Sequence, residues 1–213
     1  MQTELLIARL ARQAGPVRVN ATLNVVWARW VLVSVVSAAA GLCYYGLRRD
    51  AVAQLASAEF LARALVTTLV AMFAARHALR WGVPGMEPDG RRRYVPEIAL
   101  VTWACLLMAP LVGVAMLDRI AAVRWHPACA WQLATVAVLP ASWLCWQLRR
   151  AAPYALLWTS AQAALASAAV GALAVQWICG LNASAHHLVW HLAPMLAVTA
   201  VLALAGRLLL RQH

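Results

Sequence analysis

Thiols and imidazoles are the side chains of this sequence best suited to chemistry, and most of them fall on one side of a predicted membrane. The chain has five cysteines and six histidines. His187 and His191 are four residues apart and share one face of an α-helix, a spacing that suits two ligands on one metal ion. Thiols and imidazoles bind soft or borderline metals, and paired thiols form disulfides in oxidising compartments. The residues predicted to share this outer side are Cys43, Cys129, Cys179, His126, His186, His187 and His191.

These residues also have a purely structural interpretation. A Cys in an apolar helix is commonly a small packing residue, and a His at the membrane interface is commonly an amphipathic anchor. Haem is a further ligand for paired histidines, but such a site needs histidines deeper in facing helices, which this sequence lacks. We therefore expect no resident cofactor, and the candidate chemistry is redox or metal sensing.

The sequence contains no motif of a known catalytic type, so we predict that the protein is not an enzyme. There is no nucleophile–base–acid set, no Gly-rich phosphate loop and no paired carboxylates. Ion pumps usually carry a charge at mid-membrane, whereas Glu97 and the Glu59–Arg63 pair fall near helix starts. A small transporter stays an alternative, because Gln162 and Ser160 could line a polar pathway.

The elements that position these residues follow from composition. The chain has 213 residues, of which 64% are hydrophobic and 12% charged, whereas soluble domains carry roughly 45–50% apolar and about 25% charged residues. This excludes a soluble globule, a disordered chain and a disulfide-stapled secreted domain. Because backbone polar groups must be satisfied inside lipid, apolar runs of about 20 residues are read as helices. The predicted fold is all-α and polytopic, with six transmembrane helices at Val25–Leu47, Phe60–Leu79, Val95–Leu117, Pro127–Leu148, Ala155–Leu181 and His187–Leu210.

Arginine placement predicts the orientation of these helices. The net charge is +11, and all 18 basic residues are Arg. With both termini in the cytoplasm, 13 arginines lie on the inner side and 5 on the outer side, as the positive-inside rule expects. We interpret the charge as a topology signal that also contacts anionic lipid headgroups, with no direct binding of nucleic acid.

A short arm precedes the first membrane helix. Residues 1–14 are predicted to form a helix that ends at Gly15–Pro16, with one face made of Leu6, Ile7, Leu10 and Ala14. Such a helix lies on the inner leaflet or docks in a partner's groove. We therefore divide the chain into a cytoplasmic amphipathic arm, residues 1–22, and a six-helix transmembrane bundle, residues 23–213.

Several segments together resemble the NrsF family of six-span bacterial anti-sigma factors. They run in order through the chain and are TELLIARLARQAGPV, FLARALVTTLVAMFAARHALRWGVPG, LRRAAP and LVWHLAPMLAVTAVLALAGRLLLR. The last segment contains the Trp190–His191 pair and Gly206–Arg207.

The resemblance implies a negative regulator at the bacterial inner membrane that sequesters an extracytoplasmic-function (ECF) sigma factor and releases it under stress. It implies that the N-terminal segment makes the main contact, at the positions Leu5, Leu6, Ile7, Leu10, Pro16 and Val17. It also implies sensing of metals or oxidants at Cys129, in HPACAWQLATVAVLP, and at Cys179. At the second of these cysteines, family members often have a His-Cys pair, whereas this chain has Ile178–Cys179. The expected sensing set is completed by His186, His187 and His191.

Overall fold

The computed structural model of the chain describes residues 3–5, 7, 9, 22–83, 85–88, 90–112, 123–151, 153 and 155–209. It is all-helical, with no strand among these residues. Six segments are long and apolar enough to cross a membrane, which confirms the predicted class of multi-pass helical membrane protein. They are Leu23–Tyr45, Ala58–Trp81, Gly90–Leu111, Pro127–Arg149, Leu156–Ile178 and Ser184–Gly206.

The helices are separated by short connections. Most of the spans are single α-helices, while the third and the sixth are composite. In chain order the elements are α2 (Leu23–Tyr45), α3 (Ala51–Gln54), α4 (Ala58–Trp81), η1 (Gly90–Tyr94), α5 (Val95–Met108), η2 (Ala109–Leu111), α7 (Pro127–Arg149), α8 (Leu156–Ile178), α9 (Ser184–His187), η3 (Leu188–Leu192) and α10 (Ala193–Leu209).

Three predicted helix ends differ from the structure. The third span, expected to reach Leu117, tightens into the 3₁₀ turn η2 around Pro110 and turns extended at Val112; residues 113–122 lie outside the described part. A proline has no N–H to continue the helical ladder. The fifth span stops at Ile178, because Cys179 is extended, and the sixth begins at Ser184.

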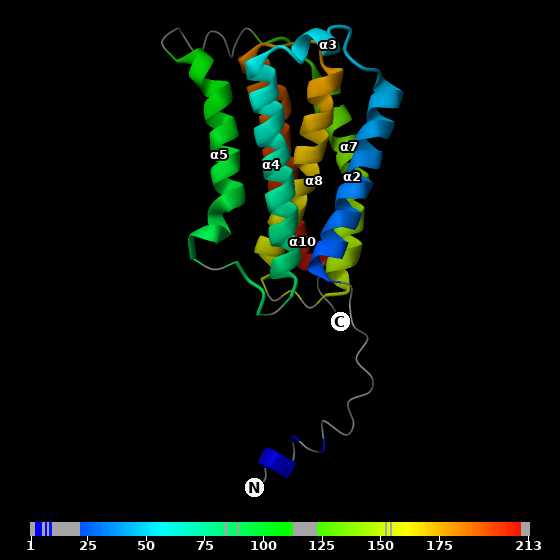
Figure 1. Ribbon diagram of the computed structural model, residues 1–213, viewed down its shortest axis with the longest axis vertical. Helices are drawn as coiled ribbons and strands as arrows, with labels where there is room; N and C mark the ends of the chain where they lie inside the picture. Colours follow the sequence, from blue (N-terminus) through cyan, green and yellow to red (C-terminus); the bar gives the residue numbers. More distant parts are fainter. Residues whose placement is uncertain are drawn as a thin grey trace.

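Helix α8 forms the centre of the bundle. It packs against α2, α4, α7 and α10, and it is the most buried of the six spans (Figure 1). Its small residues allow this close packing, because a Cβ on Gly171 would overlap the carbonyl oxygen of Leu133 on α7. The predicted close packing at Ala164, Ala168, Gly171 and Ala172 is confirmed, since all four are buried.

The bundle has two distinct ends. Helix α2 begins and α10 finishes at the same end (Figure 1), as an even number of spans requires. We call this the arm end; α7 also finishes there, at Arg149, and α8 begins there, at Leu156. We call the opposite end, where α2 finishes and α7 begins, the distal end.

The arm is described only in part. Residues 3–5, 7 and 9 are helical, and the side chains of Leu5 and Ile7 are exposed. Leu6, Leu10, Pro16 and Val17, predicted to contact a partner, lie outside the described residues. The arm connects to α2, which is fastened to α7 by a hydrogen bond of 2.7 Å from Ser37 Oγ to the carbonyl of Val136.

Candidate metal centre at the distal end

Four buried side chains meet at the distal end, and their ligand atoms all lie within 4.8 Å of one another. Cys129 comes from the first turn of α7, Cys179 directly follows α8, His186 lies in α9 and His191 in η3. The Cys129 thiol donates to Cys179 Sγ at 3.7 Å. That hydrogen bond lowers the pKa of the Cys179 thiol below its ordinary value. We call Cys129, Cys179, His186 and His191 the Cys/His cluster.

The spacing of three of the four ligand atoms fits a four-coordinate ion. With bonds of about 2.3 Å to sulfur and about 2.05 Å to nitrogen, a tetrahedron has a sulfur–sulfur edge of about 3.8 Å and sulfur–nitrogen edges of about 3.6 Å. The distance between the two Sγ atoms is 3.7 Å, and His186 Nε2 lies 3.6 Å from Cys129 Sγ and 3.4 Å from Cys179 Sγ. Two sulfur and two nitrogen donors are the set preferred by Zn²⁺ and other thiophilic ions.

His191 supplies an independent sign of a missing partner. Its side chain is fully buried, and neither ring nitrogen makes a well-aligned hydrogen bond among the described residues, although the Cys179 thiol lies close enough to interact with the ring. A buried polar group without a partner costs free energy, so such groups are usually satisfied by something. A metal ion within the cluster would satisfy one of these nitrogens.

The structure brings His186, and not His187, to the ligand atoms of the cluster. His186 lies in α9 and His191 lies five residues later, in the π-helical turn η3. The predicted ligand pair, His187 and His191, assumed the α-helical spacing of four. His187 stacks beside His191 with ring centroids 4.3 Å apart, but its Nε2 bonds the carbonyl of Leu181 at 2.9 Å. His187 therefore supports the segment after Cys179 and stands outside the four-residue ligand set.

The other residues expected on the outer side do not join the cluster. His126 packs edge-on against His186 at 5.5 Å between centroids, and its Nδ1 bonds the carbonyl of Arg124. Cys43 is exposed on α2. A cavity of about 620 Å³ opens beside His186 and His126, which gives the cluster a side for ligand access.

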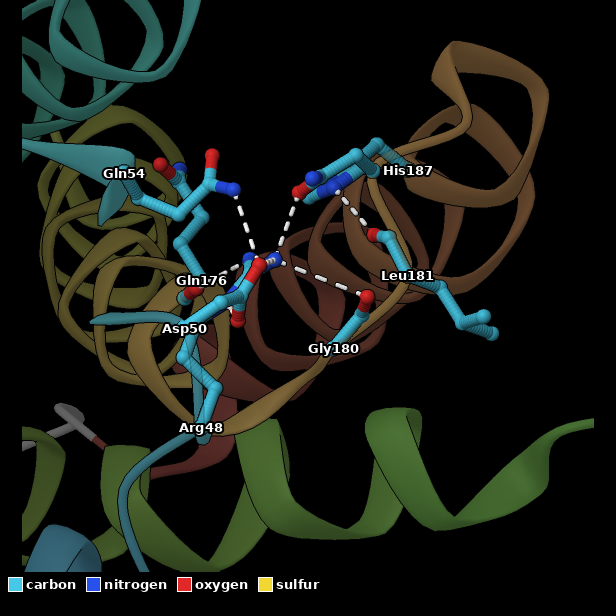
Figure 2. Close-up of polar contacts among 8 residues, drawn as sticks. Arg48, Asp50, Gln54, Gln176, Gly180, Leu181 and His187 are labelled. Atoms are coloured by element: carbon cyan, nitrogen blue, oxygen red, sulfur yellow. Dashed lines mark hydrogen bonds and ion pairs between the residues drawn. The ribbon is translucent and has the colours of Figure 1, made fainter. Parts of the chain in front are cut away.

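Arg48 holds the segment that carries Cys179. It lies just after α2, is buried, and reaches across to the stretch after α8 (Figure 2). Its backbone N–H donates to the carbonyl of Trp177 at 3.0 Å, and its guanidinium donates to Asn182 Oδ1 at 2.8 Å. It also contacts the carbonyls of Gln176 and Gly180, each at 3.5 Å. The end of α2 is thus fastened to both sides of Cys179.

Asp50 also binds the Arg48 guanidinium. We call the contacts of Arg48 with Asp50 and with the segment around Cys179 the Arg48 clamp. Both carboxylate oxygens accept from the Arg48 guanidinium, at 2.7 and 2.9 Å, in a bidentate pair. The hydrogen bonds from Arg48 lower the pKa of Asp50 from 3.8 to about 2. Sequence reasoning placed Arg48 at the outer surface but missed the clamp, because no spacing rule relates it to a segment about 130 residues away. Nearby, the predicted Glu59–Arg63 pair is confirmed at 3.5 Å.

The polar residues proposed for a transport pathway have local partners. Gln162 donates to Glu97 of α5, and Ser160 donates to the carbonyl of Leu156 and to that of Ala203 on α10. Gln162 and Ser160 line different cavities. These contacts join helices to one another and do not form a shared polar route.

The fold and the cluster define a class: a multi-pass helical membrane protein with a buried thiol–imidazole site close to one membrane surface. The family model described as "Negative regulator of sigma F", NrsF, matches residues 10–212, nearly the whole chain. This protein therefore belongs to the NrsF family, a family of sigma-factor regulators and not of enzymes. Neither the comparison with curated proteins nor that with solved structures gave a match.

Proposed function

We propose that this protein is an anti-sigma factor of the bacterial inner membrane that sequesters an ECF sigma factor and releases it when the Cys/His cluster binds a metal ion or is oxidised. Family membership supports regulation of a sigma factor. The single observation that carries the sensing part is the buried cluster, whose four ligand atoms lie within 4.8 Å of one another.

The arm is the proposed contact with the sigma factor. Its apolar residues are Leu5, Leu6, Ile7, Leu10, Pro16 and Val17, and the exposure of Leu5 and Ile7 leaves part of this surface open to a partner. An amphipathic helix that lays its apolar face in a groove is a common mode of protein recognition. Both termini are proposed to be cytoplasmic, where RNA polymerase and its sigma factors are found.

A thiophilic metal ion is the favoured signal. Binding at Cys129 and Cys179 replaces the thiol protons, which leave to solvent, and His186 and His191 donate neutral nitrogens. Oxidation is the second form of signal: a two-electron oxidant accepts the electrons, the two thiols lose their protons, and a disulfide forms. The sulfur atoms stand 3.7 Å apart and must close to about 2.05 Å, so the α7 and Cys179 backbones move closer.

The Arg48 clamp supplies a physical connection from the cluster to the arm. Cys179 lies between the Trp177 and Gly180 carbonyls that Arg48 contacts, and Arg48 follows α2, which begins where the arm ends. A ligand shifts a conformational equilibrium only when it binds the two states unequally. We propose that the ligand-bound cluster favours a second placement of the Cys179 segment, which moves α2 and withdraws the arm from the sigma factor.

The decisive test is removal of the arm. The full chain and a variant without residues 1–15 are each co-expressed with a candidate ECF sigma factor, and a promoter dependent on that factor is measured together with membrane retention of the factor. We expect the full chain to retain the factor and silence the promoter, and the truncated chain to do neither.

A second variant replaces Leu5 and Ile7 with Ser in the full-length chain. It removes the exposed apolar contacts and leaves the arm's length unchanged. Retention of the factor by the truncated chain contradicts the proposal. Truncated and full-length chains are compared at equal amounts in the membrane.

A further inference from the structure

Helices α7 and α10 leave a groove between them over the surface of α8. Two adjoining cavities, of about 440 and 510 Å³, share the lining residues Ala141, Ser142, Ala164 and Leu202. Along α7 the lining runs from Ala134 to Arg149, about 22 Å at 1.5 Å per residue. Half of a hydrocarbon core is about 15 Å, so the groove covers one leaflet and reaches its headgroup region.

The walls of the groove are mostly apolar, with Ser142 of α7 a polar exception, and they face outward from the bundle. Val138 on α7 is 60% exposed and Val201 on α10 is 64% exposed, and both line the groove. Its floor is made of small residues of α8, including Ala164 and Ala168. In a membrane-spanning segment the medium that meets such a surface is the acyl chains of lipid, which a narrow apolar groove accommodates.

The arm end of the groove carries positive charge. Arg149 lines the groove there together with Trp146. The next residue, Arg150, places its guanidinium 3.8 Å from the centroid of the Trp146 ring. Tryptophan is enriched at the headgroup level, and arginine there attracts anionic headgroups. An apolar groove that ends at an arginine and a tryptophan has the shape and charge of a phospholipid site.

We infer that this groove binds one anionic phospholipid, with an acyl chain along Ala134–Leu148 and the phosphate at Arg149. A second copy of this chain fits less well. The sequence has 18 basic and 7 acidic residues, so self-association at Arg149 brings arginines together more readily than it pairs them. The site is independent of the sigma-factor function, because it shares no residue with the cluster or the arm.

The test measures lipid retention by the full-length protein. The protein is purified in mild detergent and mixed with equal amounts of phosphatidylglycerol and phosphatidylcholine of the same acyl chains, and retained lipid is counted by native mass spectrometry. We expect phosphatidylglycerol to be retained about fivefold more than phosphatidylcholine, the preference that one arginine near a lipid headgroup confers.

Two variants separate the headgroup from the chain. Arg149→Gln removes the fivefold preference, while the control Arg49→Gln, at an exposed arginine of the distal end, keeps it. Ala141→Leu fills the groove and lowers retention of both lipids, with helix content checked by circular dichroism. If Ala141→Leu does not fold, the two arginine variants decide.

Equal retention of the two lipids by the unaltered protein contradicts the inference, and so does an equal loss of preference in Arg49→Gln and Arg149→Gln. A dimer in the mass spectrum that binds no lipid and dissociates in Ala141→Leu shows that a second copy occupies the groove, which also overturns it.

Discussion

The distal and arm ends of the same three helices are held together in different ways. At the distal end, α7, the segment after α8 and the start of the sixth span meet through the four buried side chains of the Cys/His cluster. At the arm end, α7 and α10 both pack on α8, and an apolar groove runs between them. The distal end thus gathers four ligand-type side chains in one buried place, whereas the arm end leaves a largely apolar surface between α7 and α10.

The hydrogen bonds outside the cluster and the groove also differ between the two ends. The Arg48 clamp joins the end of α2 to both sides of Cys179 through several hydrogen bonds. At the arm end, His77 of α4 lies with its two ring nitrogens each 2.8 Å from a carbonyl oxygen, of Phe73 and of Arg92. His77 therefore has local partners for both nitrogens, while His191 at the distal end makes no well-aligned hydrogen bond among the described residues.

The largest effect is expected from the two cluster thiols. Replacing Cys129 and Cys179 with Ser removes two of four ligands, and we expect Cd²⁺ or Zn²⁺ affinity to fall by more than about 100-fold, beyond the loss seen when a supporting residue is removed. The sulfur-to-cadmium absorption band of the purified protein measures this, and induction of the sigma-dependent promoter by metal is expected to disappear with it.

Cys145→Ser, in the arm-end half of α7, is the matched control and is expected to bind as the unaltered protein does. Equal loss in Cys145→Ser, or unchanged induction in the double variant, contradicts the assignment of sensing to the distal end.

An intermediate effect is expected from the histidines, and it tests which of them bind the ion. His191→Ala removes a ligand, and we expect it to lower zinc affinity about 10- to 100-fold. We expect His187→Ala to lower zinc affinity less. We expect His77→Ala to leave zinc affinity unchanged. Competition with a chromophoric chelator measures all three. A loss in His187→Ala as large as in His191→Ala shows that the pair with α-helical spacing binds the ion, contrary to the structure.

The smallest effect is expected from acid at the Arg48 clamp. The pKa of Asp50 is about 2 in the folded protein and 3.8 ordinarily, so its contribution to stability is fully present above pH 4 and is lost as the pH falls towards 2. Asp50→Asn is expected to lower the melting temperature by at most about 2–4 °C at pH 5 and by less at pH 3, because Asp50 is exposed.

The same substitution in an Arg48→Gln background provides the control, since the clamp is already broken there. We expect no pH dependence of the Asp50→Asn effect in that background. A difference between pH 5 and pH 3 that persists without Arg48 means that another group sets the pKa of Asp50.

Much of the fold could be read directly from the sequence, and the reason is physical. Long apolar runs in lipid have to be helices, because only a helix satisfies its backbone hydrogen bonds internally. The number of spans then places Cys129 and Cys179 at one end of the bundle, together with His126, His186, His187 and His191. The exceptions were ends set by local chemistry, such as Pro110 in the third span and extended Cys179 after the fifth.

Only the tertiary structure decided which of these residues meet. A sequence reports how deep a residue lies along the membrane normal, but the rotation of each helix about its axis depends on packing with its neighbours. That rotation brings Cys129 to Cys179, 50 residues later, and places His186, and not His187, among the ligand atoms. The arginine count interpreted Arg48 only as a topology signal. In the structure Arg48 is buried against the segment around Cys179, because the end of α2 lies beside that segment.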